Sequence, residues 1–173
     1  MRYELTIDAE YLDGDRWNAA AGIREFMQNG RDAAIEQRAP LDVRHYVNAE
    51  GKGVLVIENE GAVLARDTLL LGRSTKRDQQ ATLAGKYGEG YKLGALALLR
   101  HGYGVKLRNG GEVWTPTIEP SEKFNGRPVL VFTVVGGREE RNRVQVEIIG
   151  VTAEDWKALR ENFLFLYKRE ISV

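Results

Sequence analysis

The order of the predicted elements indicates an α+β fold: a two-layer sandwich in which helices cover one face of a mixed, mostly antiparallel sheet. Two observations lead to this prediction. Helical patterns gather in the first 100 residues, and a run of consecutive β-rich segments joined by short turns follows them. The strands and helices do not alternate regularly, which argues against a parallel dinucleotide-binding sheet.

Length and composition fit one domain. The chain has 173 residues, of which 43% are hydrophobic and 29% charged, so we expect a single packed core over residues 1–173. The 25 basic and 25 acidic residues balance, which gives no indication of a nucleic-acid or membrane partner. The absence of cysteine excludes disulfides and thiolate chemistry. The longest apolar run, Leu93–Leu99, is too short to span a bilayer, and the N-terminus has the pattern of a strand rather than a signal peptide. We therefore expect a cytoplasmic protein.

Alternation and helical spacing predict the elements of the first half of the chain. They are a strand at Tyr3–Ile7, a helix from about Asp15 to Gln37 ended by Pro40, a hairpin of Leu41–Val47 and Val54–Ile57, and a short helix at Arg66–Leu71. Residues 72–90 are polar and rich in glycine, which is typical of a functional lid. An apolar helix is predicted to follow at Tyr91–Leu99.

The second half is predicted to be a meander that ends in a helix. Its strands are expected at Val105–Leu107, Val113–Ile118, Val129–Val135 and Val144–Val151. Thr152 and Asp155 have the spacing of an N-terminal helix cap, which predicts a last helix through about Lys168.

The first chemical signal lies in the early helix. Glu25 and Asn29 are four residues apart and share one helix face, and Asp32 lies one turn further along the same stripe. Two carboxylates and a carboxamide beside apolar neighbours are costly unless they bind something. The Asn29 side-chain oxygen is a suitable hard ligand for Mg²⁺, and Glu25 is suited to orient and deprotonate a water molecule.

The second signal is a glycine pattern, Gly85, Gly88 and Gly90, immediately before the apolar helix. Glycine lets the backbone approach a ligand closely, and free amide groups at a helix N-terminus favour phosphate oxygens. Lys86 and Lys92 add positive charge nearby. The pattern lacks the Lys-Ser/Thr ending of a P-loop, which argues against that class.

The third signal is the strand at Val54–Ile57, which runs into the polar sequence Glu58-Asn59-Glu60-Gly61. Together the three signals resemble the Bergerat nucleotide-binding fold of the GHKL superfamily, which includes gyrase B, heat-shock chaperones, histidine kinases and MutL. The family's first box, Glu-x-x-x-Asn-x-x-Asp-Ala, is matched by Glu25, Asn29, Asp32 and Ala33.

The predicted lid also resembles that of the family. The family's lid opens with a Ser/Thr-Lys element, which Ser74-Thr75-Lys76 resembles, and closes with Gly-x-x-Gly-x-Gly before a helix. The resemblance implies that this lid wraps the triphosphate of ATP, with Lys76 and Lys86 as charge partners. The residues that would do so are Gly85, Lys86, Tyr87, Gly88, Glu89 and Gly90.

The resemblance also implies an Mg-ATP site and roles for the first box. Asn29 would ligate Mg²⁺, Asp32 would belong to the nucleotide site, and Glu25 would be the general base for attack of water on the γ-phosphate. One base, one metal and a closing lid are sufficient for this reaction, because phosphoryl transfer depends mainly on positioning and electrostatics.

The second box of the family, Asp-x-Gly-x-Gly, is altered here. Asn59 stands at the Asp that accepts a hydrogen bond from the adenine amino group, Gly61 at the first glycine and Val63 at the second. Asparagine keeps a carbonyl acceptor but adds a donor and removes a charge. Moving the alignment by one residue puts Glu58 in the acidic position and loses Gly61.

Three functions are compatible with these motifs: a slow ATP-hydrolysing switch, a nucleotide-binding regulator that does not hydrolyse, and a protein kinase. Asp32-Ala33 resembles the gyrase, chaperone and MutL branch, which favours the ATPase over the kinase. Members of that branch continue into a further domain. We therefore expect this chain to pass its nucleotide state to a protein partner or a missing downstream domain, with an ATP-dependent dimer as one possible form.

Overall fold

Seven strands form a single sheet in the order β1-β6-β5-β4-β7-β3-β2. The computed structural model describes residues 1–12, 16–69, 82–137 and 141–163, with the backbone alone for residues 82–89. Every neighbouring pair of strands is antiparallel. The strands are β1 (Arg2–Asp8), β2 (Leu41–Val47), β3 (Gly53–Glu60), β4 (Gly104–Asn109), β5 (Glu112–Pro120), β6 (Pro128–Gly136) and β7 (Arg143–Ile149).

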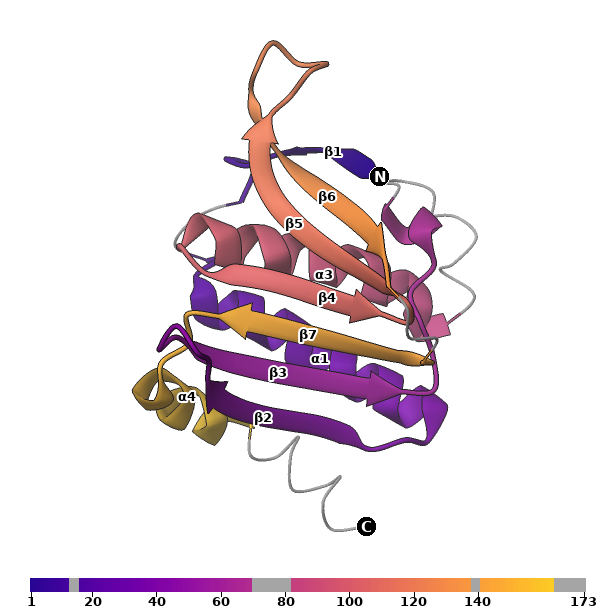
Figure 1. Cartoon of the computed structure of the whole chain (residues 1–173), viewed down its shortest axis with the longest axis vertical. Helices are drawn as coiled ribbons and strands as arrows, with labels where there is room; N and C mark the ends of the chain where they lie inside the picture. The colour runs from indigo at the N-terminus through magenta and orange to yellow at the C-terminus, as the bar shows by residue number, and fades with distance from the viewer. Residues whose placement is uncertain (13–15, 70–81, 138–140, 164–173) are drawn as a thin grey trace.

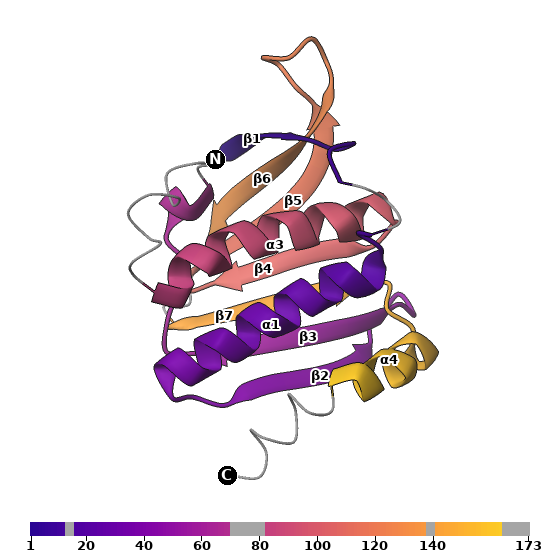
Figure 2. The same ribbon diagram turned by 180° about the vertical axis from the view of Figure 1, so that it is seen from behind.

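Two long helices cover one face of this sheet. Helix α1 (Ala19–Gln37) and helix α3 (Thr82–Arg100) lie side by side behind the strands in Figure 1 and in front of them in Figure 2. Helix α4 (Ala153–Arg160) lies beside the β2 end of the sheet, and short 3₁₀ turns occupy Arg66–Leu69 and Glu161–Phe163. The predicted α+β class, with helices on one face, is therefore confirmed. Within the part of the chain that is described, no helix has the length and apolar character needed to cross a membrane.

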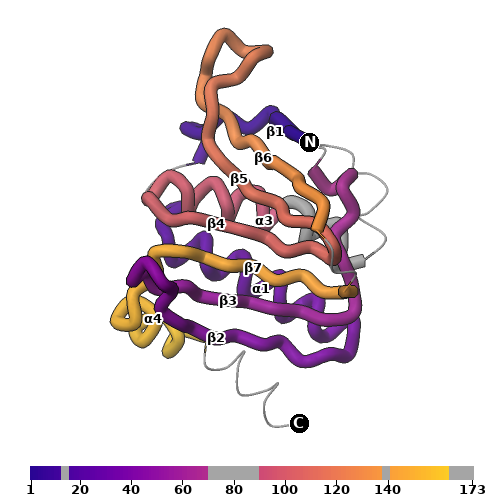
Figure 3. Tube along the Cα trace, viewed as in Figure 1, coloured from indigo at the N-terminus to yellow at the C-terminus, as the bar shows by residue number. Residues whose placement is uncertain are grey.

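The position of β7 could not be read from the local sequence. This late strand lies between β3 and β4, as the tube in Figure 3 shows, and pairs with both. Since β3 and β4 are each antiparallel to β7, they run parallel to each other, and α3 lies in the connection between them. Asn59 and Asn109 consequently stand at the same end of the sheet, on either side of Val144.

The core fills the space between the helices and the sheet. Alternate residues of the strands, such as Leu107, Val146 and Ile148, point toward the helices and are fully or almost fully buried. An aromatic group lies under α3, where the Tyr91 ring centroid is 5.8 Å from that of Phe132 and 6.4 Å from that of Trp114. This packing fixes the part of α3 that follows Gly90 against β5 and β6.

Most predicted strands are confirmed within one to three residues at each end, and three helix boundaries are corrected. Helix α1 begins at Ala19, not near Asp15, because the Asn18 side chain accepts a hydrogen bond from the Ala21 amide at 2.9 Å and caps it. Helix α3 begins at Thr82, not Tyr91, and so includes part of the predicted lid. The last helix is capped by Thr152 as predicted, but it ends at Arg160 and a 3₁₀ turn follows. Residues 164–173, into which that helix was predicted to continue, lie outside the described residues.

Candidate functional site

Glu25 and Asn29 meet helix α3 at Gly90. A methyl group added at position 90 would stand 2.9 Å from Glu25 Oε2, 2.9 Å from Asn29 Nδ2 and 3.2 Å from Asn29 Oδ1. These distances are too short for a side chain, so both polar groups lie directly against the bare backbone of α3. The structure thus brings together the predicted general base, the predicted metal ligand and the last glycine of the predicted lid.

Asn29 is the strongest polar feature of this contact. Its side chain is only 6% exposed, and its Nδ2 is buried with no hydrogen-bond partner among the described residues. A buried amide donor without a partner costs about 1–3 kcal/mol. The contact between α1 and α3 thus holds one buried donor that the described residues leave unsatisfied.

Burial raises the pKa of the Glu25 carboxyl, because the half-buried position between α1 and α3 disfavours the charged form, and the neighbouring Arg24 only partly opposes this. A carboxylate with a raised pKa is a better proton acceptor than an ordinary surface glutamate. This electrostatic environment is the kind that a general base requires.

Asp32 follows on the same stripe of α1 but has a different environment. It is half-buried and accepts a hydrogen bond from the Gln28 side chain, Nε2 to Oδ1, at 3.2 Å. The stripe predicted from the sequence therefore exists on α1. Of its three members, the contact at position 90 brings together only Glu25 and Asn29.

Asn59 ties the end of β3 to the middle of α1. Its side chain is 4% exposed, and Nδ2 donates to the Gly30 carbonyl oxygen at 2.6 Å. Asn59 thus reaches α1 one residue from Asn29. An aspartate would bring a carboxylate oxygen toward that carbonyl oxygen and could not donate while ionised. The hydrogen bond to Gly30 therefore explains the asparagine at position 59 without any contact with a nucleobase.

Gly61 forms the turn after β3. Its φ of +101° lies in the region that side chains rarely adopt, and an added methyl group would contact Gln37 at 3.2 Å. The glycine is therefore explained by the turn, which lies at the C-terminal end of α1 rather than beside Asn29.

Asn109 is a buried polar residue that the sequence pattern did not single out. Its amide holds the backbone of Leu64 at two points, accepting from the Leu64 amide at 2.7 Å and donating to the Leu64 carbonyl at 2.7 Å. The clamp fixes the segment between β3 and the predicted lid to the end of β4. Its position depends on the pairing of both β3 and β4 with β7, which puts the ends of β3 and β4 on the same side of the sheet.

The glycines of the predicted lid lie inside α3. In an α-helix only the first four amide groups lack a partner within the helix. Because α3 begins at Thr82, the Gly88 and Gly90 amides lie beyond that first turn, so the expectation of free amides at these glycines is corrected. Lys76 lies outside the described residues, as do the side chains of Lys86, Tyr87 and Glu89. Lys92, also on α3, is buried at 1% exposure.

The side chains that meet at Gly90 offer a cation few oxygen ligands. The described residues contain no group of three or more His, Asp or Glu side chains arranged around one point. A protein commonly supplies Mg²⁺ with one or two oxygen ligands and leaves the rest to phosphates and water. An Mg²⁺ ion at Glu25 and Asn29 would therefore need phosphate and water oxygens to complete its ligands.

Comparison with known proteins adds no assignment. No protein-family model matches the sequence, and no curated protein matches it at a significant level.

Proposed function

We propose that the chain binds Mg-ATP on its helical face, hydrolyses it slowly and signals its nucleotide state to a protein partner, as members of the GHKL superfamily do. The observation that carries the proposal is the meeting of Glu25 and Asn29 at Gly90, with the Asn29 Nδ2 buried and unpaired. The motif match and this contact support the same site independently, because one rests on sequence spacing and the other on packing between α1 and α3.

In this proposal each group has one task. Asn29 offers its side-chain oxygen to Mg²⁺, which when bound neutralises charge that develops on the phosphates. Glu25 accepts a proton from the attacking water, and its raised pKa suits that role. Asn59 keeps the end of β3 against α1, and its side-chain oxygen is the candidate acceptor for the amino group of adenine.

The N-terminal half of α3 is the proposed moving part. Gly85, Gly88 and Gly90 each cost about 1 kcal/mol relative to alanine in a helix, so this stretch is about 3 kcal/mol weaker than an alanine-containing one. Unwinding it would free the amides of Gly88 and Gly90 for phosphate oxygens and separate α3 from Glu25 and Asn29. ATP would then be coupled to a helix-to-loop change that a partner can sense.

Calorimetry with two variants tests the proposal. Asn29→Ala should abolish Mg-ATP binding, whereas Glu25→Ala should retain binding and stop phosphate release. Glu36→Ala is the matched control, because Glu36 is an exposed residue near the other end of α1 and should leave both properties unchanged. If the wild-type chain binds no ATP at millimolar concentration, the proposed site is wrong.

A non-hydrolysing regulator is the second candidate. It is favoured by the contact between Glu25 Oε2 and α3, since a base held against backbone is not placed beside a water molecule. The two candidates separate on phosphate release by the wild-type protein. A nucleotide panel of ATP, GTP and ADP tests the altered second box at the same time. Discrimination between ATP and GTP is expected if Asn59 accepts from adenine.

A further inference from the structure

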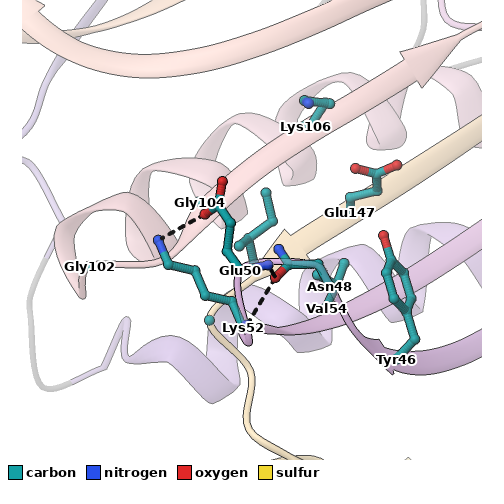
Figure 4. Close-up of a pocket in the computed structure, with 11 residues that line it drawn as sticks. Tyr46, Asn48, Glu50, Lys52, Val54, Gly102, Gly104, Lys106 and Glu147 are labelled. Carbon is teal, nitrogen blue, oxygen red and sulfur yellow. Dashed lines mark hydrogen bonds and ion pairs between the residues drawn. The ribbon is translucent and has the colours of Figure 1, made fainter.

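A hollow of about 560 Å³ lies on the face of the sheet opposite to α1 and α3 (Figure 4). Its floor follows one cross-strand row, in which Tyr46 pairs with Val54, Val54 with Ile149, and Ile149 with Gly104. Strand alternation places this row outward, since Leu55 and Ile148 belong to the core on the other side. The volume is in the range of small-molecule sites, about 300–1,000 Å³.

Gly104 creates the hollow at the β4 end of the row. A methyl group there would meet Ile149 only at 3.4 Å, an ordinary contact, and the backbone of Gly104 is not among the glycines with positive φ. The fold would therefore accept a side chain at this position. Glycine weakens a strand relative to alanine, and it often marks a point where a ligand approaches closely.

The neighbouring row of side chains on this face of the sheet places two opposite charges side by side, and no ion pair forms between them. Lys106 and Glu147 are direct cross-strand neighbours. Glu147 Oε1 instead accepts from Arg108 Nε at 3.0 Å, and neither Glu147 Oε2 nor the Lys106 ammonium has a hydrogen-bond or ion-pair partner within the described residues. The Lys106 ammonium and Glu147 Oε2 are therefore not committed to another described residue, and both side chains line the hollow in Figure 4.

The rim of the hollow is held in place by its own turn. Asn48 Oδ1 accepts from the Glu50 amide at 3.0 Å and from the Lys52 amide at 2.9 Å, so the turn between β2 and β3 keeps a fixed shape. On β2, Tyr46 is 45% exposed and presents a ring beside the apolar floor. The lining thus combines an apolar floor, an aromatic ring and charges of both signs.

We propose that this hollow binds a free α-amino acid with an aromatic side chain. The amino-acid carboxylate contacts Lys106, its ammonium contacts Glu147, and its ring lies over Ile149 beside Tyr46. Directly opposed residues on antiparallel strands have Cβ atoms about 4.5–5.5 Å apart, which suits the two neighbouring charges of a zwitterion. The lining contains two lysines and two glutamates, and the glutamates disfavour a doubly charged phosphate.

The site does not depend on the proposed ATP function, because it lies on the other face of the sheet. It is tested by calorimetry on the nucleotide-free chain with phenylalanine, phenylalaninamide and 3-phenylpropionate. The amide lacks the carboxylate and the propionate lacks the ammonium, so each should bind at least tenfold more weakly than phenylalanine. Leucine, which keeps both charges without the ring, should also bind more weakly.

Two variants locate the binding. Gly104→Leu fills the hollow and should abolish phenylalanine binding, whereas Gly136→Leu changes a glycine at the end of β6 with open space around it and should not. Lys106→Gln should weaken phenylalanine binding at least tenfold while leaving phenylalaninamide binding unchanged. Circular dichroism checks that each variant is folded. No binding of phenylalanine at millimolar concentration, equal binding of all four compounds, or wild-type affinity in Gly104→Leu would overturn the proposal.

Discussion

Single glycines and asparagines set the distance between the helical layer and the sheet. At Gly30, an added methyl group would stand 2.9 Å from Leu41 Cδ1 and 3.1 Å from Ile57 Cγ2, so α1 lies directly on β2 and β3. The Asn59 side chain then reaches the Gly30 carbonyl from the sheet side. Close packing and a buried hydrogen bond therefore fix the part of α1 that carries Asn29.

The pH dependence of stability should reveal the environment of Glu25. Burial raises the pKa of Glu25 in the folded state above its ordinary value, so its ionisation opposes folding. The penalty is absent below the unfolded pKa and grows as the pH rises through the raised folded value. Glu25→Gln should therefore be more stable than the wild type at pH 7, and the two should converge near pH 4. Urea unfolding from pH 4 to 8 measures this difference. Glu36→Gln, an exposed change on the same helix, should show no such trend.

Asn59→Asp tests whether Asn59 acts as a donor. The change removes the hydrogen bond to the Gly30 carbonyl and leaves that buried acceptor opposite a carboxylate, so we expect a loss of roughly 1–3 kcal/mol at pH 7. Part of the loss should return at low pH, where a protonated aspartate can donate. Chemical denaturation at both pH values measures the effect.

Asn48→Asp provides the matched control for this experiment. The Asn48 side chain acts through its oxygen as an acceptor, which an aspartate preserves, so this variant should keep near-normal stability. Equal losses in the two variants would show that the donor at position 59 is not the important feature.

At the scale of elements, local patterns were sufficient for the strands and insufficient for α3. Alternation predicted β2 to the residue, because Leu41–Val47 is bounded by Pro40 and by the turn around Gly51. Helix α3 was predicted to begin nine residues late, because Gly85, Gly88 and Gly90 have low helix propensity. Long-range packing decided the outcome, since Gly90 fits against Glu25 and Asn29 only as a bare backbone.

The local sequence likewise predicted only part of the candidate site. The four-residue spacing on one helix was enough to place Glu25 and Asn29 together. Their meeting with Gly90, and the position of Asn109 beside the end of β3, depend on how α3 crosses α1 and on β7 lying between β3 and β4. Pairings between segments 40 to 90 residues apart leave no local signal in a single sequence.

Replacing two glycines of α3 should shift its helix-to-loop equilibrium toward the helix. Gly85→Ala with Gly88→Ala should stabilise the helical form by about 2 kcal/mol in total. If ATP binds the unwound form, its affinity should fall about thirtyfold, because binding must then overcome the added helix stability. Hydrogen exchange should show slower exchange of the amides at residues 85–90 in the variant. Unchanged ATP affinity together with slower exchange would show that ATP binds without unwinding α3.

At the scale of the whole molecule, the sheet separates two candidate sites and is shared by both. Strand β3 contributes Asn59 to the helical face and Val54 to the hollow on the opposite face. Strand β7, which lies between β3 and β4, also lines this hollow. At the β1 edge of the sheet, the side chains of Glu4 and Asp8 contact the β5–β6 hairpin that projects in Figure 1.

The contacts of β1 with the hairpin predict how the molecule responds to acid. The Ser121 hydroxyl, which donates to the Glu4 carboxylate, holds the pKa of Glu4 below its usual value, and the Glu10 amide followed by Arg127 does the same for Asp8. A lowered folded pKa means that these contributions to stability are fully present above the unfolded pKa values and are lost as the pH falls through the folded pKa values.

Glu4→Gln should therefore be less stable than the wild type at pH 7, and the difference should shrink on acidification, which is opposite in sign to the effect at Glu25. Acid titration followed by near-UV circular dichroism measures both trends, with the exposed Glu10→Gln as the control. A constant difference between Glu4→Gln and the wild type across the acid range would show that the Glu4 charge does not hold the hairpin to β1.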